Sequence, residues 1–278
     1  MHSVKKLLHK VPCIICNLNK KMRHNTNFGE KILDRFLWAL PIILIFAAWE
    51  VFLQVGILSA NTIPPPSRII VTLWNCSGHP VFIMWVLQSL ANIIIGVLLA
   101  LPLALVLAVT TGLRSEIDHT LTPTIMIFGA LPDLALLPIF VFWFGPGAFA
   151  AILMAMICSF FPIFFSVREG VKEIPEDFFH VTKIFKAGKV DKFTKVVLPA
   201  ILPSTIAGVR IAFDFVWEIV LAIEIIARVS GIGSFIETSM QSGSMELAFA
   251  GIFAIGVLVL TIDRLVFTRA EGKIARWL

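Results

Sequence analysis

A run without a single charged side chain, from His79 to Leu113, constrains this chain more than any other feature. The run is longer than the ~20 apolar residues that one membrane-spanning helix needs. Other apolar runs lie on both sides of it, and 58% of the 278 residues are hydrophobic while 15% are charged. Soluble domains carry about 25% charged residues. The sequence therefore predicts an all-α, polytopic membrane protein with room for one membrane domain and for no large soluble domain.

The apolar runs predict six spans, at roughly residues 36–58, 90–113, 121–144, 148–167, 202–227 and 247–266. Basic residues concentrate before the first span, between the fourth and fifth spans, and after the last. Loops rich in lysine and arginine face the cytoplasm. The predicted organisation is a basic cytoplasmic tail over residues 1–35, a membrane domain over residues 36–268 and a cytoplasmic tail over residues 269–278, with both termini inside.

The segment between the first two spans carries a single basic residue, Arg68, and is expected to lie outside. Residues 63–67 are expected to be non-helical, because the prolines among them lack an N–H group and restrict the residues that precede them. The uncharged run from His79 exceeds one span. An interfacial segment is therefore expected before the second span begins at about Leu90.

The third predicted span contains Pro123, Pro132 and Pro138. Three prolines predict a broken or kinked helix, which a membrane tolerates only against protein or a water-filled cavity. This span is therefore expected to line a translocation pathway.

Charged residues inside the predicted spans are expected to face protein or water, because each costs about 2.5 to 3.5 kcal/mol in hydrocarbon. They are Glu50, Asp133, Arg210, Asp214, Glu218 and Glu224. Arg210 with Asp214, and Glu224 with Arg228, are spaced i,i+4, so each pair either neutralises itself or contacts substrate. Glu218 and Asp133 have no cation at such spacing. The candidate pathway residues are Pro132, Asp133, Arg210, Asp214, Trp217, Glu218 and Glu224.

The polar stretch over residues 176–203 separates the fourth and fifth spans. Its lysines are Lys183, Lys186, Lys189, Lys192 and Lys195. Apolar residues between them have helical spacing over residues 178–185 and again over 190–197, and Gly188 is expected to separate two short helices. Two interpretations stay open. The pair either lies on the membrane surface with its lysines toward lipid phosphates, or docks into a groove on a partner.

No motif of an enzyme is present, so no catalytic residue is predicted. Gly188-Lys189 and Gly272-Lys273 lack the upstream glycine and the hydroxyl residue of a phosphate-binding loop. Cys13 and Cys16 have no second pair of ligands nearby in the sequence, and no metal site or other cofactor is expected. The net charge of +5 resides beside apolar runs, which favours membrane orientation over nucleic-acid binding. If a nucleotide energises transport, another polypeptide is expected to bind it.

Several motifs in order resemble the permease subunits of binding-protein-dependent ABC importers, in the group for nitrate, sulfonates and taurine. The similarity covers residues 37–278 and rests on short segments. These are Ile63-Pro64-Pro65-Pro66-Ser67, Leu131 to Pro138 with Phe142 to Gly145, Phe161-Pro162-Ile163, Val196 to Pro203, Gly208 to Ala212 and Gly231-Ile232-Gly233. The resemblance implies a type I importer fold and a bacterial inner (plasma) membrane. Asn92 departs from the family, which often has arginine there.

In that family a loop with a Glu-Ala-Ala…Gly…Leu-Pro signature forms helices that couple to the ATPase. Counting back from Leu198-Pro199, the signature residues fall on His180 to Thr182 and on Lys186, and this chain departs at all four. Gly188 is expected to take over the turn. The resemblance places the coupling loop at about residues 168–198. It implies the coupling residues Phe178, His180, Val181, Thr182, Ile184, Lys186, Gly188, Phe193, Leu198 and Pro199.

The resemblance implies a permease that imports a small solute as a homodimer, with ATPase subunits inside, a substrate-binding protein outside and lipid around it. A dimer also fits the lack of any visible internal repeat. Nitrate, sulfonates, taurine and neutral pyrimidine precursors of thiamine stay open as substrates, and the embedded acids Asp133 and Glu218 disfavour a highly charged anion. Two alternatives also stay open. One is an ATP-independent channel or secondary carrier, and the other is a degenerate subunit that assembles without transporting.

Overall fold

The computed structural model describes residues 28–56 and 62–274, and the regular elements in these residues are all helices. Residues 1–67 and 68–278 form two compact units, and each is described by itself. Most of the predicted N-terminal tail, with Cys13 and Cys16, lies outside the described residues.

The first unit contains α3 (Phe28–Gln54), which includes Pro41. Glu50 near its end is hydrogen bonded within the same unit. One carboxylate oxygen accepts from the Ser67 hydroxyl at 2.9 Å, and the other accepts from the Ser67 N–H at 3.3 Å. This charged residue of the first predicted span therefore has a polar partner in its own unit.

Two helices replace the loop and the interfacial segment that were expected after the first span. α4 (Pro66–Ser77) begins at the third proline, because a first helical residue needs no N–H partner. The expected non-helical structure is confirmed only for residues 63–65. α5 (Pro80–Leu113) runs without a break through the position of the expected interfacial segment, so no helix begins at about Leu90 as expected.

Three long helices form the core of the second unit, and α8 (Ala148–Lys172) packs against both α5 and α11 (Leu198–Ile226). A stripe of small residues at every fourth position of α5 allows the closest approach. It consists of Gly96, Ala100, Ala104, Ala108 and Gly112. A Cβ atom added at Gly96 would lie 2.9 Å from the Met156 nitrogen of α8. Small residues at such positions are the usual basis of tight helix packing in membranes.

The third predicted span is broken, as its prolines indicated. α6 (Ser115–Gly129) and α7 (Asp133–Phe144) meet at an angle of 85° across residues 130–132. Pro132 is the N-cap of α7, whereas Pro123 and Pro138 lie inside the two helices. The bend brings the first residue of α7, Asp133, into a cavity wall that α11 also forms.

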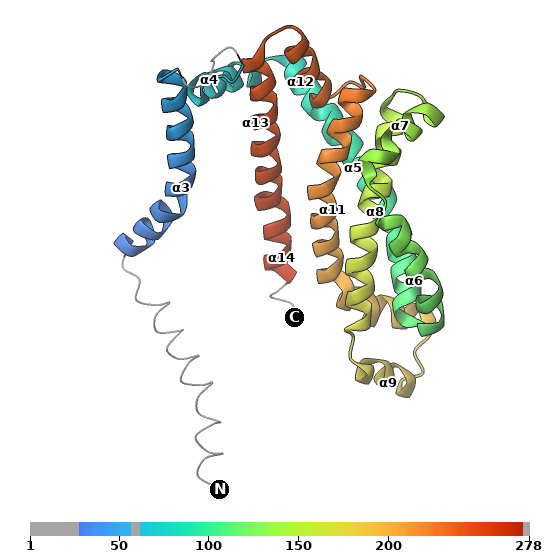
Figure 1. Cartoon of the computed structure of the whole chain (residues 1–278). Helices are drawn as coiled ribbons and strands as arrows, with labels where there is room; N and C mark the ends of the chain where they lie inside the picture. Colours follow the sequence, from blue (N-terminus) through green and yellow to red (C-terminus); the bar gives the residue numbers. More distant parts are fainter. Residues whose placement is uncertain (1–27, 57–61, 275–278) are drawn as a thin grey trace. The chain divides into compact units, whose positions relative to one another are not determined.

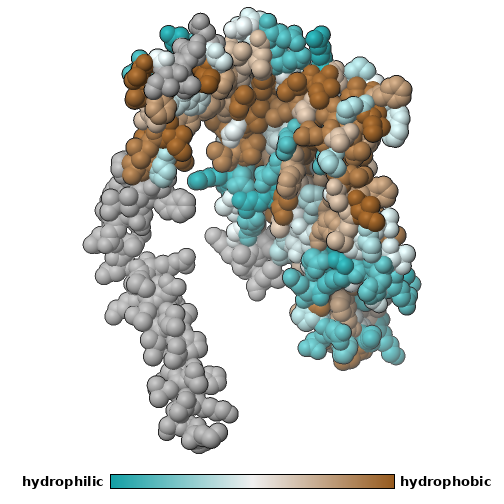
Figure 2. Space-filling model, in the orientation of Figure 1, coloured by the Kyte–Doolittle hydropathy of each residue, from teal (hydrophilic) through white to brown (hydrophobic). Residues whose placement is uncertain are grey.

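The polar loop and the C-terminal helices lie at defined ends of the second unit (Figure 1). The loop consists of α9 (Glu176–Ile184), α10 (Lys189–Lys192) and the π-helix η1 (Phe193–Val197), which leads directly into α11. α12 (Ile232–Gln241), α13 (Met245–Ile262), the π-helix η2 (Asp263–Phe267) and α14 (Thr268–Ile274) follow. α9 and α14 lie toward one end and α12 at the other. Figure 2 shows hydrophilic residues over the α9 end and near α12, with hydrophobic residues between them.

By length and composition, three described segments can cross a membrane, Pro80–Leu113, Ala148–Lys172 and Met245–Lys273. The bent pair of α6 and α7 is a fourth candidate. Four of the six predicted spans thus fall on these candidates, whereas the predicted spans 36–58 and 202–227 fall on α3 and α11, which are not among them. α3 contributes the shorter apolar stretch Leu40–Gln54, and the 29-residue α11 carries four charged residues.

Candidate functional site

The loop from α9 to η1 exposes large apolar side chains beside its lysines. Phe178, Val181, Ile184, Phe185, Val190 and Phe193 are all exposed. Lys195 pairs with Asp191 at 2.6 Å, and the Lys192 ammonium lies 4.5 Å from the centre of the Phe179 ring. Lys183, Lys186 and Lys189 form no ion pair within the described residues. The result is a surface with both hydrocarbon and free positive charge, which suits contact with another macromolecule.

Within the loop, a hollow of about 380 Å³ lies between α9 and the start of the next helical segment. Thr182, Lys186 and Gly188 line it together with Val181, Phe185, Ala187, Asp191, Lys195 and Val196. Four of the predicted coupling residues therefore share one surface feature. Leu198 and Pro199 begin α11 and are exposed, and His180 is exposed on α9.

The turn after α9 is built on Lys186, not on Gly188. Lys186 has a φ of 47°, in the left-handed region, whereas Gly188 has a φ of −65° and is the N-cap of α10. The Ala187 N–H donates to the Thr182 carbonyl at 2.9 Å and the Lys186 N–H to the Lys183 carbonyl at 3.1 Å. This is a Schellman motif, whose left-handed position strongly favours glycine. The expectation that Gly188 takes over the turn is therefore wrong, although it does separate the two short helices.

Replacing Lys186 by glycine is expected to stabilise the loop by about 1 kcal/mol, because a left-handed conformation costs an L-residue about 1 to 2 kcal/mol. Lys183→Gly is the matched control, since Lys183 lies inside α9. That substitution is expected to destabilise by about 1 kcal/mol. Amide hydrogen exchange of α9 in the purified protein measures both effects. Slower exchange of the α9 amides in Lys183→Gly than in Lys186→Gly would contradict the left-handed turn at Lys186.

A cluster of charged residues that sequence reasoning missed joins α6 to the end of α8. Asp118, in the first turn of α6, accepts hydrogen bonds from the Arg168 Nε at 2.5 Å and the Lys172 Nζ at 2.6 Å. The Thr122 hydroxyl donates to the same carboxylate at 2.6 Å. The Arg168 guanidinium, aided by Lys172 and Thr122, holds the pKa of the Asp118 carboxyl well below its usual range. The predicted topology placed the start of α6 and the end of α8 on the same side of the membrane. This shared side was the sequence feature that could have indicated the cluster.

The two unpaired carboxylates of the predicted spans come together at a second cavity. Asp133 and Glu218 line a hollow of about 220 Å³ with Pro132, Leu134, Phe215 and Ile219. The Cys158 thiol of α8 lies beside the Asp133 carboxyl. Asp214 is exposed on the same helix as Glu218, and neither forms an ion pair within the described residues. Three of the seven pathway candidates, Pro132, Asp133 and Glu218, therefore line one cavity. Asp214 is exposed four residues before Glu218 on α11.

The other pathway candidates have different surroundings. Arg210 pairs with Asp263 of η2 at 2.7 Å and with Glu271 of α14 at 2.9 Å, and not with Asp214 as the i,i+4 spacing suggested. Trp217 is 5% exposed and packs edge-on against Phe213. The Arg210 pairs join α11 to η2 and α14, whereas the Trp217–Phe213 contact lies within α11. Neither Arg210 nor Trp217 lines the cavity of Asp133 and Glu218.

Glu224 is fully buried, and the ion pair suggested by its spacing from Arg228 does not form. Arg228 lies 3.6 Å from Glu237 of α12 instead. The Glu224 carboxylate accepts hydrogen bonds from Ser89 of α5 and Gly233 of α12. This residue is part of a contact among three helices and does not line a described cavity.

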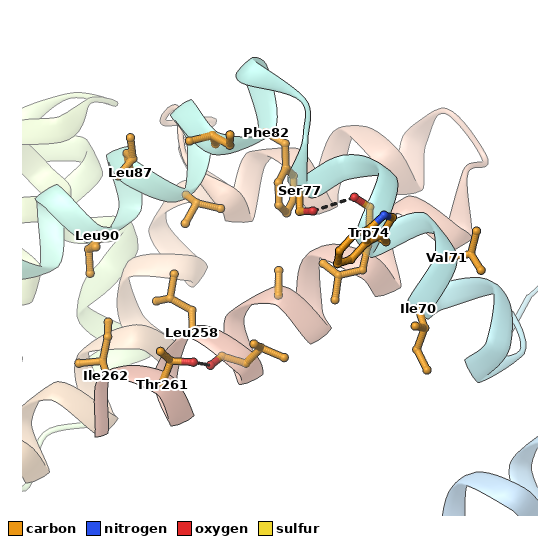
Figure 3. Close-up of a pocket in the computed structure, with 15 residues that line it drawn as sticks. Ile70, Val71, Trp74, Ser77, Phe82, Leu87, Leu90, Leu258, Thr261 and Ile262 are labelled. Atoms are coloured by element: carbon orange, nitrogen blue, oxygen red, sulfur yellow. Dashed lines mark hydrogen bonds between the residues drawn. The ribbon is translucent and has the colours of Figure 1, made fainter. Parts of the chain in front are cut away.

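A hollow of about 860 Å³ lies between α4, α5 and α13 (Figure 3). Hydrocarbon lines most of it, from residues such as Trp74, Leu87 and Leu258. The Ser77 and Thr261 hydroxyls at its edge donate to backbone carbonyls of their own helices. Because no charged group lines it, this groove is not a candidate pathway for a polar solute.

Comparison with known proteins identifies the family. Residues 96–268 match the family model for the inner-membrane component of binding-protein-dependent transport systems. An aliphatic sulfonate transport permease of Bacillus subtilis is 26% identical, over 87% of this chain and 89% of that protein. A nitrate import permease of Synechococcus elongatus is 28% identical, over 83% and 86%. The taurine transport permease of Escherichia coli is 25% identical, over 79% and 82%.

The fold matches a solved structure as well. A chain of the methionine ABC transporter MetNI in an inward-facing conformation superposes with a TM-score of 0.62 at 18% identity, over 70% of this chain and 96% of that one. This similarity confirms the expected importer permease fold. The chain belongs to the family of inner-membrane components of binding-protein-dependent transport systems, and is a permease subunit of an ABC importer.

Proposed function

We propose that two copies of this chain line a pathway for a small solute, driven by separate ATPase subunits that bind the loop from α9 to η1. A substrate-binding protein delivers the solute from outside. In this arrangement both termini and the loop are cytoplasmic, and α12 is external. The position of α9 and α14 toward one end of the second unit supports this orientation (Figure 1).

The observation that carries the proposal is the direct connection between the two candidate sites. η1 ends at Val197 and α11 begins at Leu198 without an intervening turn. α11 then presents Glu218 to the cavity that it shares with Asp133. A partner that moves the exposed loop therefore moves the cavity wall through one helix. The π-helix supports the same interpretation, because such segments are frequent at functional sites.

The homodimer is supported by carboxylates on the exposed face of α11. Asp214 and Glu218 are both exposed on α11, the helix that falls on the predicted fifth span, residues 202–227. Lipid is a poor environment for such groups, which in membranes almost always face protein or water. A second copy that packs across this face encloses the groups in a water-filled pathway. Copies related by a two-fold axis bring the same surface from each side.

The solute is proposed to be small and not a highly charged anion. The relatives are named for aliphatic sulfonates, nitrate and taurine. In this chain, however, the cavity contains the acidic residues Asp133 and Glu218 and no basic residue. Carboxylates repel anions at short range in a low-dielectric site. A neutral solute, or one with a positive group such as taurine, suits this cavity better than nitrate does.

Charge reversal in the loop tests the proposed coupling. The triple variant Lys183→Glu, Lys186→Glu and Lys189→Glu is expected to lose both co-purification of the ATPase subunit and ATP-dependent uptake into vesicles. Lys273→Glu is the control, because Lys273 is an exposed lysine of α14 outside the loop. Nitrate and taurine serve as labelled solutes. Unchanged complex and uptake in the triple variant, or uptake that follows a proton gradient without ATP, would refute the proposal.

A further inference from the structure

A buried carboxylate lies where α5, α11 and α12 meet, and the proposed coupling and pathway do not use it. Glu224 of α11 is 0% exposed. Its Oε2 atom accepts from the Ser89 hydroxyl and from the Gly233 N–H, each at 2.9 Å. Its Oε1 atom has no hydrogen-bond partner among the described residues. A carboxylate so far from water needs a compensating positive charge or an equivalent set of donors.

The N-terminus of α12 supplies that compensation. The first N–H groups of a helix have no partner within it, and they carry the positive end of the helix dipole. Here the Ile232 N–H donates to the Ser89 hydroxyl at 2.8 Å and the Gly233 N–H donates to Glu224. The Ser89 hydroxyl in turn donates a hydrogen bond to the Glu224 carboxylate. Two side chains from two other helices therefore cap α12, and we call this set of contacts the α12 cap.

Two glycines make the α12 cap sterically possible. A Cβ atom at Gly231 would overlap the Glu224 carboxyl group. A Cβ atom at Gly233 would lie 2.7 Å from the Leu221 carbonyl oxygen and 2.8 Å from the Glu224 Cβ. The Ser234 hydroxyl adds a third link by donating to the Glu224 carbonyl at 2.9 Å. The Gly231-Ile232-Gly233 segment thus lets the backbone approach the buried Glu224 carboxylate. This close approach is a steric reason for the two glycines of this family motif.

We propose that Glu224 is a positioning residue that fixes α12 to α5 and α11 through the α12 cap. α11 runs from the loop at one end of the unit to α12 at the other (Figure 1). The consequence for transport rests on the function proposed above. With the α12 cap intact, a displacement that enters α11 at Leu198 also moves α12, so the external surface responds to the ATPase. Without it, α11 and α12 move separately.

Amide hydrogen exchange of the purified permease tests the cap directly and requires no ATPase. Glu224→Ala is expected to speed exchange of the Gly233 amide, which donates to Glu224, by about tenfold or more, the effect of losing a hydrogen bond to a charged group. Ser89→Ala is expected to act mainly on Ile232. Glu224→Gln keeps an acceptor oxygen and is expected to preserve most of the protection. Gln241→Ala, an exposed position of α12, is the control.

The pattern among these variants decides the proposal. Exchange of Ile232 and Gly233 as slow in Ser89→Ala and Glu224→Ala as in the parent would overturn it. If Glu224→Ala does not fold, Ser89→Ala carries the same test. Equal exchange in Glu224→Gln and Glu224→Ala would also overturn it, because a cap requires the acceptor.

ATP hydrolysis by the assembled transporter in vesicles tests the mechanical consequence. Ser89→Ala is expected to keep the basal rate and to lose the stimulation by the substrate-binding protein, whereas Gln241→Ala keeps both. Full stimulation in Ser89→Ala despite faster amide exchange would overturn the link between α11 and α12. Loss of ATPase binding in the lysine variants concerns only the proposed docking loop, so the two failures are distinguishable.

Discussion

Gly96→Ala is expected to destabilise the folded protein by about 1 to 3 kcal/mol, the cost of overpacking a close contact. Gly96 lies in the small-residue stripe where α5 approaches α8. An added Cβ would lie 2.9 Å from the Met156 nitrogen and 3.0 Å from the Ala155 carbonyl carbon. Both are backbone atoms of α8, so a rotamer change cannot relieve the contact. The helices must separate, and the neighbouring alanines of the stripe lose their contacts as well.

Gly256→Ala provides a matched control in the same unit. Gly256 lies inside α13, and no heavy atom lies within 4 Å of an added Cβ. Helix propensity alone then favours alanine by about 1 kcal/mol. Thermal unfolding in detergent, followed by tryptophan fluorescence, measures both variants. A Gly96→Ala protein as stable as Gly256→Ala would show that α5 and α8 do not pack as described.

The sequence predicted the helical class and the break in the third span because both follow from local chemistry. Apolar length sets a span, and Pro132, which has no N–H group to donate, lies at the break between α6 and α7. The same rules failed at Pro66, where proline begins α4. A proline weakens a helix interior but fits a first turn, and composition alone does not distinguish these positions. The expected start of the second span at about Leu90 failed similarly, because an uncharged run does not mark where a helix begins.

The partners of the membrane charges were harder to predict. The i,i+4 rule finds pairs on one helix, yet Arg210 pairs with residues 53 and 61 positions away and Arg228 pairs across a turn. Such partners depend on how helices pack. Asp133 and Glu218 were correctly selected as acids without a local cation, and the structure places both at one cavity. Alignment with the family's loop signature likewise identified Lys186 as the residue at the glycine position. It did not predict the left-handed backbone conformation that Lys186 adopts there.

Loss of the Asp118 carboxylate is expected to be the most damaging single charge removal. The Asp118 and Arg168 side chains are 10% and 12% exposed, and Lys172 is 37% exposed. Asp118→Ala removes the buried partner of a nearly buried guanidinium, which then keeps, among the described residues, only its contact with the exposed Glu169. Removing one member of a fully buried pair costs about 3 to 5 kcal/mol. Because Lys172 reaches solvent, we expect about 2 to 3 kcal/mol here. Glu116→Ala is the control, since Glu116 is exposed in the same turn of α6.

The pH dependence of stability identifies the ionised form of Asp118 as the stabilising one. Arg168, Lys172 and Thr122 hold the pKa of this carboxyl below the value of about 3.9 that it has in an unfolded chain. A lowered folded-state pKa stabilises the protein above the unfolded pKa, and that stabilisation is lost as the pH falls below about 4. Asp118→Asn cannot ionise and lacks this contribution at every pH. The difference in free energy of unfolding between parent and Asp118→Asn is therefore expected to be constant near pH 7 and to shrink toward pH 3. A difference that stays constant over this range would mean that Arg168 and Lys172 do not depend on the charge of Asp118.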